Sequence, residues 1–292
     1  MYRSQRVPLA AEPGGAAGAS YPAPRSSMLD VEFAQLSDRG KVRQHNEDYL
    51  GFAIPATPEQ ARTHGWLFAL ADGVGGHELG EVASRMAVES LLAGFREATG
   101  DEAHSTLLPG LVRTANQRIY EAGLAAGQGL AMATTLVACA VRFDRAVVAH
   151  VGDSRCYLIR LGQATQLTRD HTVAADQERL GLLSEREAAK AETRHTLSRS
   201  LGSDLFVNVE VGERQVFAED VLLLCCDGLY GEVSATEMAA IVTHNASLEA
   251  AARKLVALAN RRDGGDNISV QLIRIKGVER VGMYRGRPYR LH

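Results

Sequence analysis

The sequence predicts an α+β fold of four layers, in which two mainly antiparallel β-sheets lie face to face between flanking helices. Three observations support this prediction. Many short apolar runs follow one another after only a few residues, which favours hairpins and antiparallel pairing. Each predicted helix has one apolar face, so each should cover a sheet. The chain has 292 residues, 46% of them hydrophobic, which is enough for one large core.

Nine segments have the length and the apolar, β-branched or aromatic content expected of strands. They cover residues 31–36, 49–54, 66–71, 134–143, 145–151, 155–160, 206–211, 221–226 and 268–275. The segment 221–226 holds only residues of the kind that form a protein core, so it is predicted to be a buried strand.

Apolar residues spaced i, i+3, i+4 and i+7 predict three amphipathic helices. The apolar positions are Val88, Leu91, Leu92 and Phe95 in the first, Leu108, Leu111, Val112, Ala115 and Ile119 in the second, and Leu248, Ala251, Ala252, Leu255, Leu258 and Ala259 in the third. Two capping-box patterns, Ser184 with Glu187 and Ser234 with Glu237, predict the starts of two further helices.

The composition changes at both ends of the chain and in one internal segment. Residues 1–27 are rich in Ala, Gly, Pro and Ser, which predicts a flexible tail, and residues 28–276 form the predicted globular domain. Within that domain, the polar segment at about 168–196 is predicted to be a flap over the end of a sheet. Residues 277–292 are basic; a solvated tail is the simpler interpretation, and docking to an acidic partner is the alternative.

The overall composition excludes several classes of protein. The net charge of -3 and the lack of a basic, aromatic-rich stripe argue against a nucleic-acid partner. The cysteines show no C-x-x-C spacing and lie in or beside apolar runs, as reduced core thiols do; they are Cys139, Cys156, Cys225 and Cys226. No apolar run approaches the ~18 residues of a membrane span, and no signal peptide is evident. We therefore expect a cytoplasmic monomer with no membrane span.

Aspartates recur at the ends of predicted strands. Asp72, Asp153 and Asp227 each follow an apolar run, and Asp266 precedes one. A single Asp-Gly pair predicts no more than a turn, but four such acids indicate a cluster. A buried carboxylate is costly unless something neutralises it. Because Mg²⁺ and Mn²⁺ prefer carboxylate and carbonyl oxygens, the cluster predicts a site for hard divalent cations, to which Gly73 could add its carbonyl.

The segment "SDRGKVRQHNEDYLG" contains Arg43, Glu47 and Asp48. Alone it would be interpreted as a surface loop of mixed charge. Beside the strand-end aspartates it has another meaning, because several carboxylates around two cations are typical of two-metal hydrolysis. The guanidinium of Arg43 could bind a phosphate through two hydrogen bonds and stabilise the charge that develops on it.

Eight motifs together resemble the metal-dependent serine/threonine protein phosphatases of type 2C (the PPM family), in their bacterial form. In the expected order they are "SDRGKVRQHNEDYLG", "ADGVGGHELGEVAS", "MATTLVACAV", "VGDSRCYLIR", "LTRDHT", "LSRSLG", "LCCDGLYGEV" and "GGDNISVQLI". The resemblance extends from about residue 28 to residue 275. It implies a serine/threonine phosphoprotein phosphatase in which a hydroxide bridging two Mn²⁺ or Mg²⁺ ions attacks phosphorus in line.

The resemblance also implies roles for individual residues. Asp72 would bridge the two metals, the Gly73 carbonyl would bind one of them, and Asp227 with Asp266 would hold the other. The remaining implied roles are action through metal-bound waters for Glu47 and Asp48, a weaker third metal site at Asp153, the grip on the substrate phosphate for Arg43, and support of the Asp266 loop for Asn267. The implied substrates are phosphoserine and phosphothreonine proteins, including a serine/threonine protein kinase.

Two positions depart from the family pattern. Val74 stands where eukaryotic members commonly have a histidine that is proposed as the general acid. We expect a metal-bound water to act instead, with His77 as the alternative. Cys226 stands where many relatives have serine, and we expect a difference in packing only. His171, in "RDHT", is expected to fix its loop by hydrogen bonds.

Two other functions remain open at this point. The chain could be a catalytically weak regulator that binds phosphoproteins, although such a protein would be expected to lack one or more metal carboxylates. It could also be a two-metal phosphoesterase that acts on a small phosphoester, since the catalytic centre would look the same.

Overall fold

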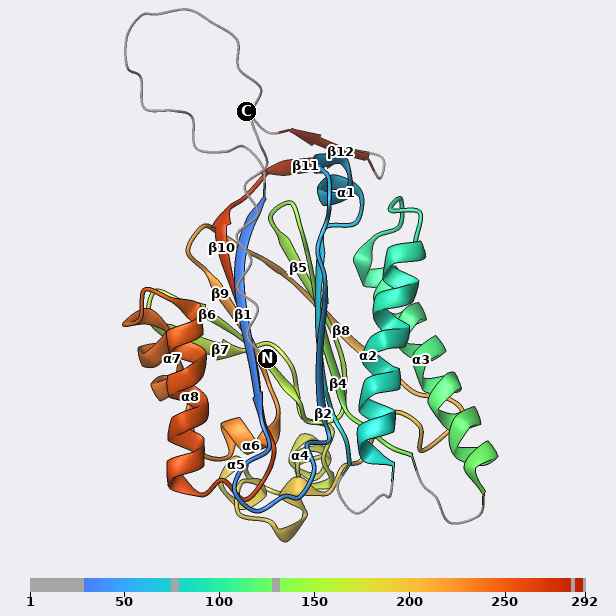
Figure 1. The fold of residues 1–292 in the computed structure, drawn as a ribbon, viewed down its shortest axis with the longest axis vertical. Helices are drawn as coiled ribbons and strands as arrows, with labels where there is room; N and C mark the ends of the chain where they lie inside the picture. Colours follow the sequence, from blue (N-terminus) through green and yellow to red (C-terminus); the bar gives the residue numbers. More distant parts are fainter. Residues whose placement is uncertain (1–28, 75–78, 128–131, 285–286, 291–292) are drawn as a thin grey trace, which may run out of the picture.

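The computed structural model describes residues 29–74, 79–127, 132–284 and 287–290. It has the predicted four layers: two five-stranded antiparallel sheets pack face to face, with helices on both outer faces (Figure 1). The predicted tail at 1–27 and His77 lie outside the described residues. Within the described part of the chain, no helix is long and apolar enough to cross a membrane.

The first sheet contains the first and the last of the predicted strands. Its order is β1 (Asp30–Asp38), β10 (Ile268–Gly277), β9 (Val221–Cys225), β6 (Arg155–Arg160) and β7 (Gln163–Gln166). Two helices cover its outer face, α7 (Ala235–Thr243) and α8 (Leu248–Arg262). Their apolar faces pack on the sheet, as the helical periodicity predicts.

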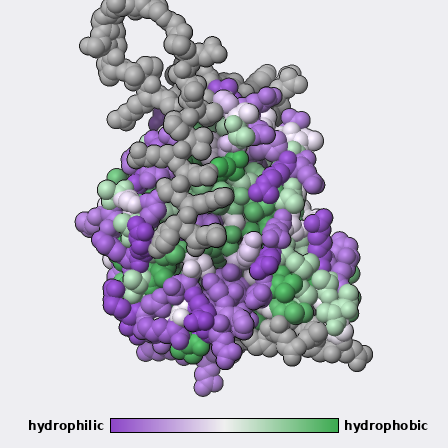
Figure 2. Space-filling model, viewed as in Figure 1, coloured by the Kyte–Doolittle hydropathy of each residue, from purple (hydrophilic) through white to green (hydrophobic). Residues whose placement is uncertain are grey.

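The second sheet carries the two longest helices. Its order is β2 (Asp48–Ala53), β3 (Trp66–Asp72), β4 (Leu136–Arg142), β5 (Arg145–Val151) and β8 (Glu210–Gln215). The covering helices are α2 (Gly80–Glu97) and α3 (His104–Ala126). Figure 2 shows polar side chains over the lower left of this face, with apolar side chains near its middle and at its lower right.

Strand β9 shows how the alternation of side chains builds two cores at once. Leu222, Leu224 and the following Cys226 pack between the two sheets. Leu223 and Cys225 point to the other face and pack under α7 and α8. Because all of these residues are buried, β9 is a rigid support for the acidic residue that follows it.

The predicted strand at 206–211 is wrong. The strand begins at Glu210 and runs to Gln215, where it pairs with β5 at the edge of the second sheet. Phe206 is 87% exposed, whereas Val207 and Val209 pack on the core from an irregular segment. An edge strand with exposed side chains has no apolar pattern, so the apolar residues before it gave the misleading signal.

Several short elements have no counterpart in the prediction. Among them are β7, α1 (Pro58–Thr63) and the hairpin of β11 (Val281–Tyr284) and β12 (Arg287–Arg290), which lies within the segment interpreted as a basic tail. These four have six residues or fewer, too few for a periodic pattern to emerge.

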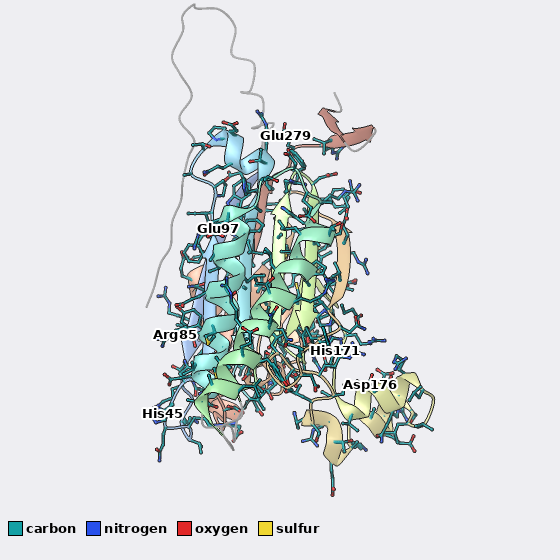
Figure 3. The ribbon with its side chains drawn as sticks, turned by 90° about the vertical axis from the view of Figure 1, so that its right-hand side faces the viewer. His45, Arg85, Glu97, His171, Asp176 and Glu279 are labelled. Atoms are coloured by element: carbon teal, nitrogen blue, oxygen red, sulfur yellow. The ribbon has the colours of Figure 1, made fainter. Side chains whose placement is uncertain are left out.

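The predicted flap is present and has its own helices. It contains α4 (Val173–Arg179), α5 (Glu185–Ala188) and the 3₁₀ helix η1 (Glu192–His195). Its two ends are joined, because the Val173 N–H donates to the Thr196 carbonyl at 2.8 Å. Figure 3 shows this segment, marked by Asp176, projecting from the lower end of the molecule.

Candidate active site

The predicted site residues converge on one pocket of about 510 Å³. Both sheets contribute to it, and the flap closes one side. The lining residues that the sequence predicted are Arg43, Asp72, Gly73, Asp153, Asp227 and Asp266. The others are Val74, Ala133, Thr135, His195, Thr196, Leu197, Ser200 and Ser203.

Asp72 enters the pocket from the second sheet, at the last position of β3. Its backbone is fixed on both sides: its N–H donates to the Thr135 hydroxyl at 3.1 Å, and its carbonyl accepts from the Thr134 hydroxyl at 2.7 Å. The next residue must be glycine, because a Cβ at Gly73 would lie 2.6 Å from the backbone carbonyl of Gly80. The chain can therefore turn closely past the start of α2 while the Asp72 carboxylate faces the pocket.

Asp227 and Asp266 enter from the first sheet. Asp227 is the first residue of α6 (Asp227–Tyr230), separated from β9 by Cys226 alone, and Asp266 lies just before β10. Because β9 and β10 are hydrogen-bonded neighbours, the two carboxylates meet at the same end of the sheet. The predicted cluster of strand-end aspartates is thus assembled from two sheets.

Asn267 links the Asp266 loop to the loop that carries Arg43 and Glu47. Its side-chain amide donates to the carbonyls of Arg39 and His45, both at 3.0 Å, and its side-chain oxygen accepts the Glu47 N–H at 2.8 Å. Asn267 is 4% exposed, so these bonds are protected from water. The side chain holds together two segments about 220 residues apart in the sequence.

Glu47 and Asp48 lie behind the pocket lining. The Glu47 carboxylate is 3.8 Å from the Arg43 guanidinium and would touch a Cβ at Gly80. Asp48 is buried, and neither of its carboxylate oxygens has a hydrogen-bond partner among the described residues. One ligand atom each from Asp48, Asp72 and Cys226 lie within 4.8 Å of one another. Since buried carboxylates are normally hydrogen-bonded or paired, this donor set fits a bound divalent cation.

The pKa values of the acids reflect this crowding. Burial raises the pKa of Asp48 to about 7, although the polar neighbours Ser269 and Cys226 oppose the shift. Burial, together with the charge of Asp227, also raises the pKa of Asp153 to about 7. The pKa of Asp72 lies well above its usual range, and that of Asp227 is raised, again by burial first and neighbouring carboxylates second. The raised pKa values show that burial disfavours the ionised carboxylates, which a bound cation would stabilise.

Arg43 stands at the edge of the acidic cluster. Its guanidinium donates to the Asp266 carboxylate at 2.8 Å, and 37% of its side chain is exposed. Partial burial lowers the pKa of Arg43, but the bond to Asp266 and the nearby acids outweigh this and raise it overall. A permanently charged, partly exposed fork beside the carboxylates is suited to bind an anion that enters the pocket.

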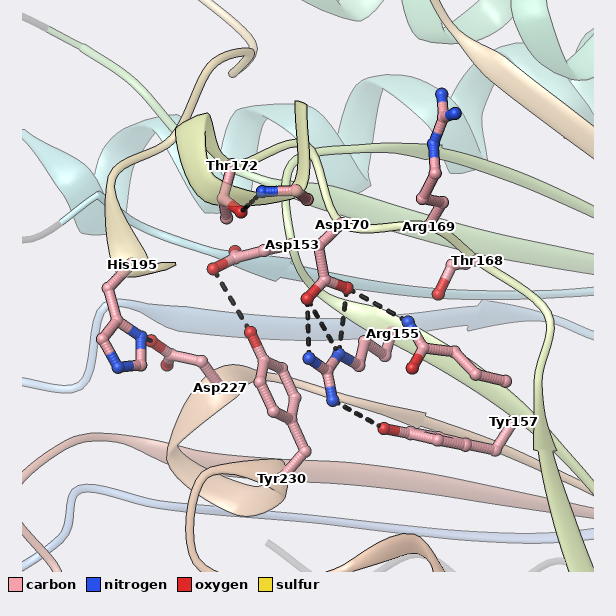
Figure 4. A network of polar contacts seen from close by, with 12 residues as sticks. Asp153, Arg155, Tyr157, Thr168, Arg169, Asp170, Thr172, His195, Asp227 and Tyr230 are labelled. Atoms are coloured by element: carbon pink, nitrogen blue, oxygen red, sulfur yellow. Dashed lines mark hydrogen bonds and ion pairs between the residues drawn. The ribbon is translucent and has the colours of Figure 1, made fainter. Parts of the chain in front are cut away.

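Asp153 belongs to a network that reaches the base of the flap (Figure 4). The Tyr230 hydroxyl donates to the Asp153 carboxylate at 3.2 Å, and the Arg155 guanidinium lies 3.5 Å from the centroid of the Tyr230 ring. Arg155 donates to Asp170 at 2.6 Å, and Asp170 lies two residues before Thr172, the N-cap of α4. The network connects Asp153 to the flap through side chains that the sequence analysis did not single out.

His195 is a titratable pocket residue that sequence reasoning missed. It ends η1, and its Nδ1 is 4.0 Å from the Asp227 carboxylate (Figure 4). Its side chain is 51% exposed. The only signal in the sequence is its position two residues before the motif "LSRSLG". Val74, at the position of the eukaryotic histidine, lines the same pocket and cannot transfer a proton.

His171 fixes its loop, as expected. Its backbone N–H donates to the Gly152 carbonyl at 3.0 Å, and its Nδ1 accepts the Gly152 N–H at 3.1 Å. His150 and Glu210 approach it closely enough to suggest a second metal site. However, Arg169 donates to the Glu210 carboxylate at 2.8 Å, and Arg199 lies 3.3 Å from His171 Nε2. Two cationic side chains already occupy this group, so we interpret it as structural.

Comparison with known proteins places this geometry in context. The family model described as protein phosphatase 2C matches residues 35–268. The serine/threonine phosphatase stp of Listeria welshimeri is 35% identical over 254 residues, which cover 86% of this chain and 96% of that protein.

Solved structures agree in fold over nearly the same region. The serine/threonine phosphatase of S. agalactiae superposes with a TM-score of 0.76 at 32% identity, covering 84% of this chain and 99% of that one. The catalytic domain of the serine/threonine protein phosphatase PstP, solved in complex with two manganese ions, gives a TM-score of 0.71 at 33% identity, with coverage of 85% and 99%.

Proposed function

Because the chain belongs to the protein phosphatase 2C family, we propose that it hydrolyses phosphoserine and phosphothreonine in proteins, at the pocket that holds Asp72, Asp227 and Asp266. The observation that carries this proposal is the convergence of carboxylates from both sheets beside a partly exposed arginine. The carboxylates suit cations and the arginine suits a phosphate, so one pocket has donors for both parts of a metal–phosphate complex.

The metal assignment rests on the same residues. We propose that the pocket binds two Mn²⁺ or Mg²⁺ ions. Asp72 and the Gly73 carbonyl would hold one ion. Asp227 and Asp266 would hold the other, and Asp72 would contact both. Glu47 and Asp48 would act through bound waters, and Asp153 would hold a weaker third ion. The unpartnered oxygens of Asp48 and the raised pKa values of Asp72 and Asp227 support a site that needs positive charge. When bound, such ions activate water and neutralise the phosphate charge.

The chain's own side chains would orient the substrate. Arg43 can turn from Asp266 to the phosphate, because both side chains line the same pocket. Asn267 keeps the Asp266 loop and the Arg43 loop at a fixed separation through its three hydrogen bonds. Val74 has no proton to give, so we propose that water in the pocket protonates the leaving oxygen, with His77 as the alternative.

We extend the proposal to the cellular setting. A serine/threonine protein kinase is proposed among the phosphoprotein substrates. A monomeric state is part of the same proposal. A cytoplasmic location is supported by the four unpaired, buried thiols. The match of the family model to residues 35–268 supports a catalytic domain at 28–276, with the flap at 168–196 inside it.

The test is hydrolysis of p-nitrophenyl phosphate and of a phosphothreonine peptide, each with Mn²⁺, with Mg²⁺ and with EDTA. Metal-dependent turnover of both is expected. Asp227→Asn should lower turnover by at least about 100-fold, because it removes a metal-binding charge. Asp101→Asn, at an exposed acid outside the pocket, is the matched control.

Three results would count against the proposal. Undiminished turnover by Asp227→Asn would remove Asp227 from the metal site. Turnover of the small ester alone would indicate a small-phosphoester hydrolase. Metal binding without any turnover would indicate a phosphoprotein-binding regulator.

A further inference from the structure

Cys226 is the one thiol placed beside the acidic cluster among the described residues. It is fully buried, and its Sγ lies within 4.8 Å of carboxylate oxygens of both Asp48 and Asp72. The sulfur donates to the Asn267 carbonyl at 3.3 Å and accepts the Ser269 N–H at 3.1 Å. Packing alone would require none of these polar contacts.

Beside the cysteine, the burial of Asp48 supplies a second observation. Its side chain is 8% exposed, yet neither carboxylate oxygen has a hydrogen bond within the described parts of the chain. A buried carboxylate of this kind is stabilised by a nearby cation. One of the Asp48 carboxylate oxygens lies within 4.8 Å of both the Cys226 sulfur and a carboxylate oxygen of Asp72.

The distances suit a small tetrahedral ion. Zn–S bonds are about 2.3 Å and Zn–O bonds about 2.0–2.2 Å, so two ligand atoms of one ion lie roughly 3.5 Å apart. Contraction of the three-residue group by about 1 Å would bring its atoms to that separation. The Ser269 N–H would remain as a donor to a bound thiolate, and the thiol proton would pass to solvent.

We infer that Cys226, Asp48 and Asp72 form a mixed sulfur–oxygen site that selects a thiophilic divalent cation such as Zn²⁺. Soft thiolate ligands favour Zn²⁺ and related ions, whereas Mg²⁺ and Mn²⁺ prefer oxygen alone. Asp72 and Asp48 are also proposed to serve the catalytic ions, so a Zn²⁺ ion at Cys226 would compete with them. That inhibitory consequence rests on the proposed function, but the binding site itself does not.

The first test is spectroscopic and needs no turnover. The full-length, metal-free protein is titrated with Co²⁺ alone under reducing conditions, and the near-ultraviolet spectrum is searched for a thiolate-to-cobalt charge-transfer band. The band should appear in the wild type and be lost in Cys226→Ser. Cys225→Ser is the matched control, because Cys225 faces the opposite side of β9 and packs under the helices; it should keep the band.

A second test measures affinity. By competition with a chromophoric chelator, Cys226→Ser should bind Zn²⁺ at least about tenfold more weakly, while its affinity for Mn²⁺ should stay within about twofold of the wild type. Circular dichroism checks that each variant is folded, and Cys226→Ala replaces the serine variant if that one is not.

The inference is overturned if the wild type shows no band, if Cys226→Ser retains it, or if Zn²⁺ and Mn²⁺ affinities fall equally. An additional assay adds Zn²⁺ to the Mn²⁺-dependent phosphatase reaction, where the wild type should be inhibited at lower Zn²⁺ than Cys226→Ser. If the protein has no phosphatase activity, the cobalt spectrum still decides the metal site, so the two proposals fail separately.

Discussion

Arg43 is held between two acids, Asp266 at 2.8 Å and Glu47 at 3.8 Å, and it still has a third of its side chain exposed. The proposed phosphate contact lies outside the metal ligands. We therefore expect Arg43→Ala to raise KM for a phosphopeptide about tenfold or more, the value of one charge-assisted contact, with a smaller effect on kcat.

Arg39→Ala is the matched control for steady-state measurement of this effect. Arg39 is an exposed arginine in the same loop, and it is not part of the pocket lining. An unchanged KM in Arg43→Ala, or an equal rise in both variants, would show that Arg43 makes no specific contact with the phosphate.

His104 is a buried titratable residue that is not part of the proposed active site. It is 5% exposed, packs 5.6 Å from the Phe95 ring, and its Nε2 has no partner in the described structure. Burial, and then the charge of Arg142, lower its pKa from 6.5 to about 4. The folded state therefore favours neutral His104, and its contribution to stability is present above pH 6.5 and lost as the pH falls towards 4.

This shift predicts a difference between wild type and His104→Phe, which keeps a ring but cannot titrate. Between pH 7 and pH 5, the free energy of unfolding of the wild type should fall by about 2 kcal/mol more than that of the variant. Urea unfolding at the two pH values measures this. Parallel losses in both proteins would contradict the assignment to His104.

At the scale of elements, two helices begin with the same capping box but occupy different settings. Ser234 with Glu237 starts α7, whose residues Met238 and Ala239 pack in the core under the first sheet. Ser184 with Glu187 starts α5, a helix of four residues in the flap. Loss of the capping box should therefore lower the stability of the whole domain at α7, but only that of the flap at α5.

We expect Ser234→Ala to lower Tm by about 2–4 °C, because loss of an N-cap weakens a helix that belongs to the cooperative core. Ser184→Ala should leave Tm unchanged and accelerate proteolytic cleavage of the flap. Calorimetry and limited proteolysis distinguish the two results. A fall in Tm for Ser184→Ala as large as that for Ser234→Ala would mean that the flap unfolds together with the core.

At the scale of the whole molecule, the acidic pocket joins the two sheets. Asp72 comes from the second sheet, whereas Asp227 and Asp266 come from the first. A cation shared by these carboxylates would both neutralise them and link the sheets. Mn²⁺ at 100 times its Kd should therefore raise the free energy of unfolding by about 2.7 kcal/mol for each site filled.

Denaturant unfolding with Mn²⁺, with EDTA and with a monovalent salt of equal ionic strength measures this stabilisation. EDTA should reverse it, and Asp227→Asn should reduce it. Equal stabilisation by the monovalent salt would indicate general screening of the acids and would contradict a specific site.

The sequence by itself determined the layers and the acids of the site. The apolar stripe of α8 and the buried run of β9 are local patterns, because hydrophobic periodicity follows from the geometry of each element. The acids that end β3 and precede β10 could be identified because they interrupt such runs, and the ordered motifs identified the family.

Only the tertiary structure decided which side chains meet. The bond of Arg43 to Asp266 joins residues 223 positions apart, and His195 reaches Asp227 from the flap. The start of β8 was missed because this edge strand is stabilised by hydrogen bonds to β5. Its own side chains are largely exposed and show no apolar pattern. The position of the Cys226 thiol beside Asp48 and Asp72 has the same origin. Contacts between distant segments depend on how the sheets pack, and no local pattern in the sequence records that packing.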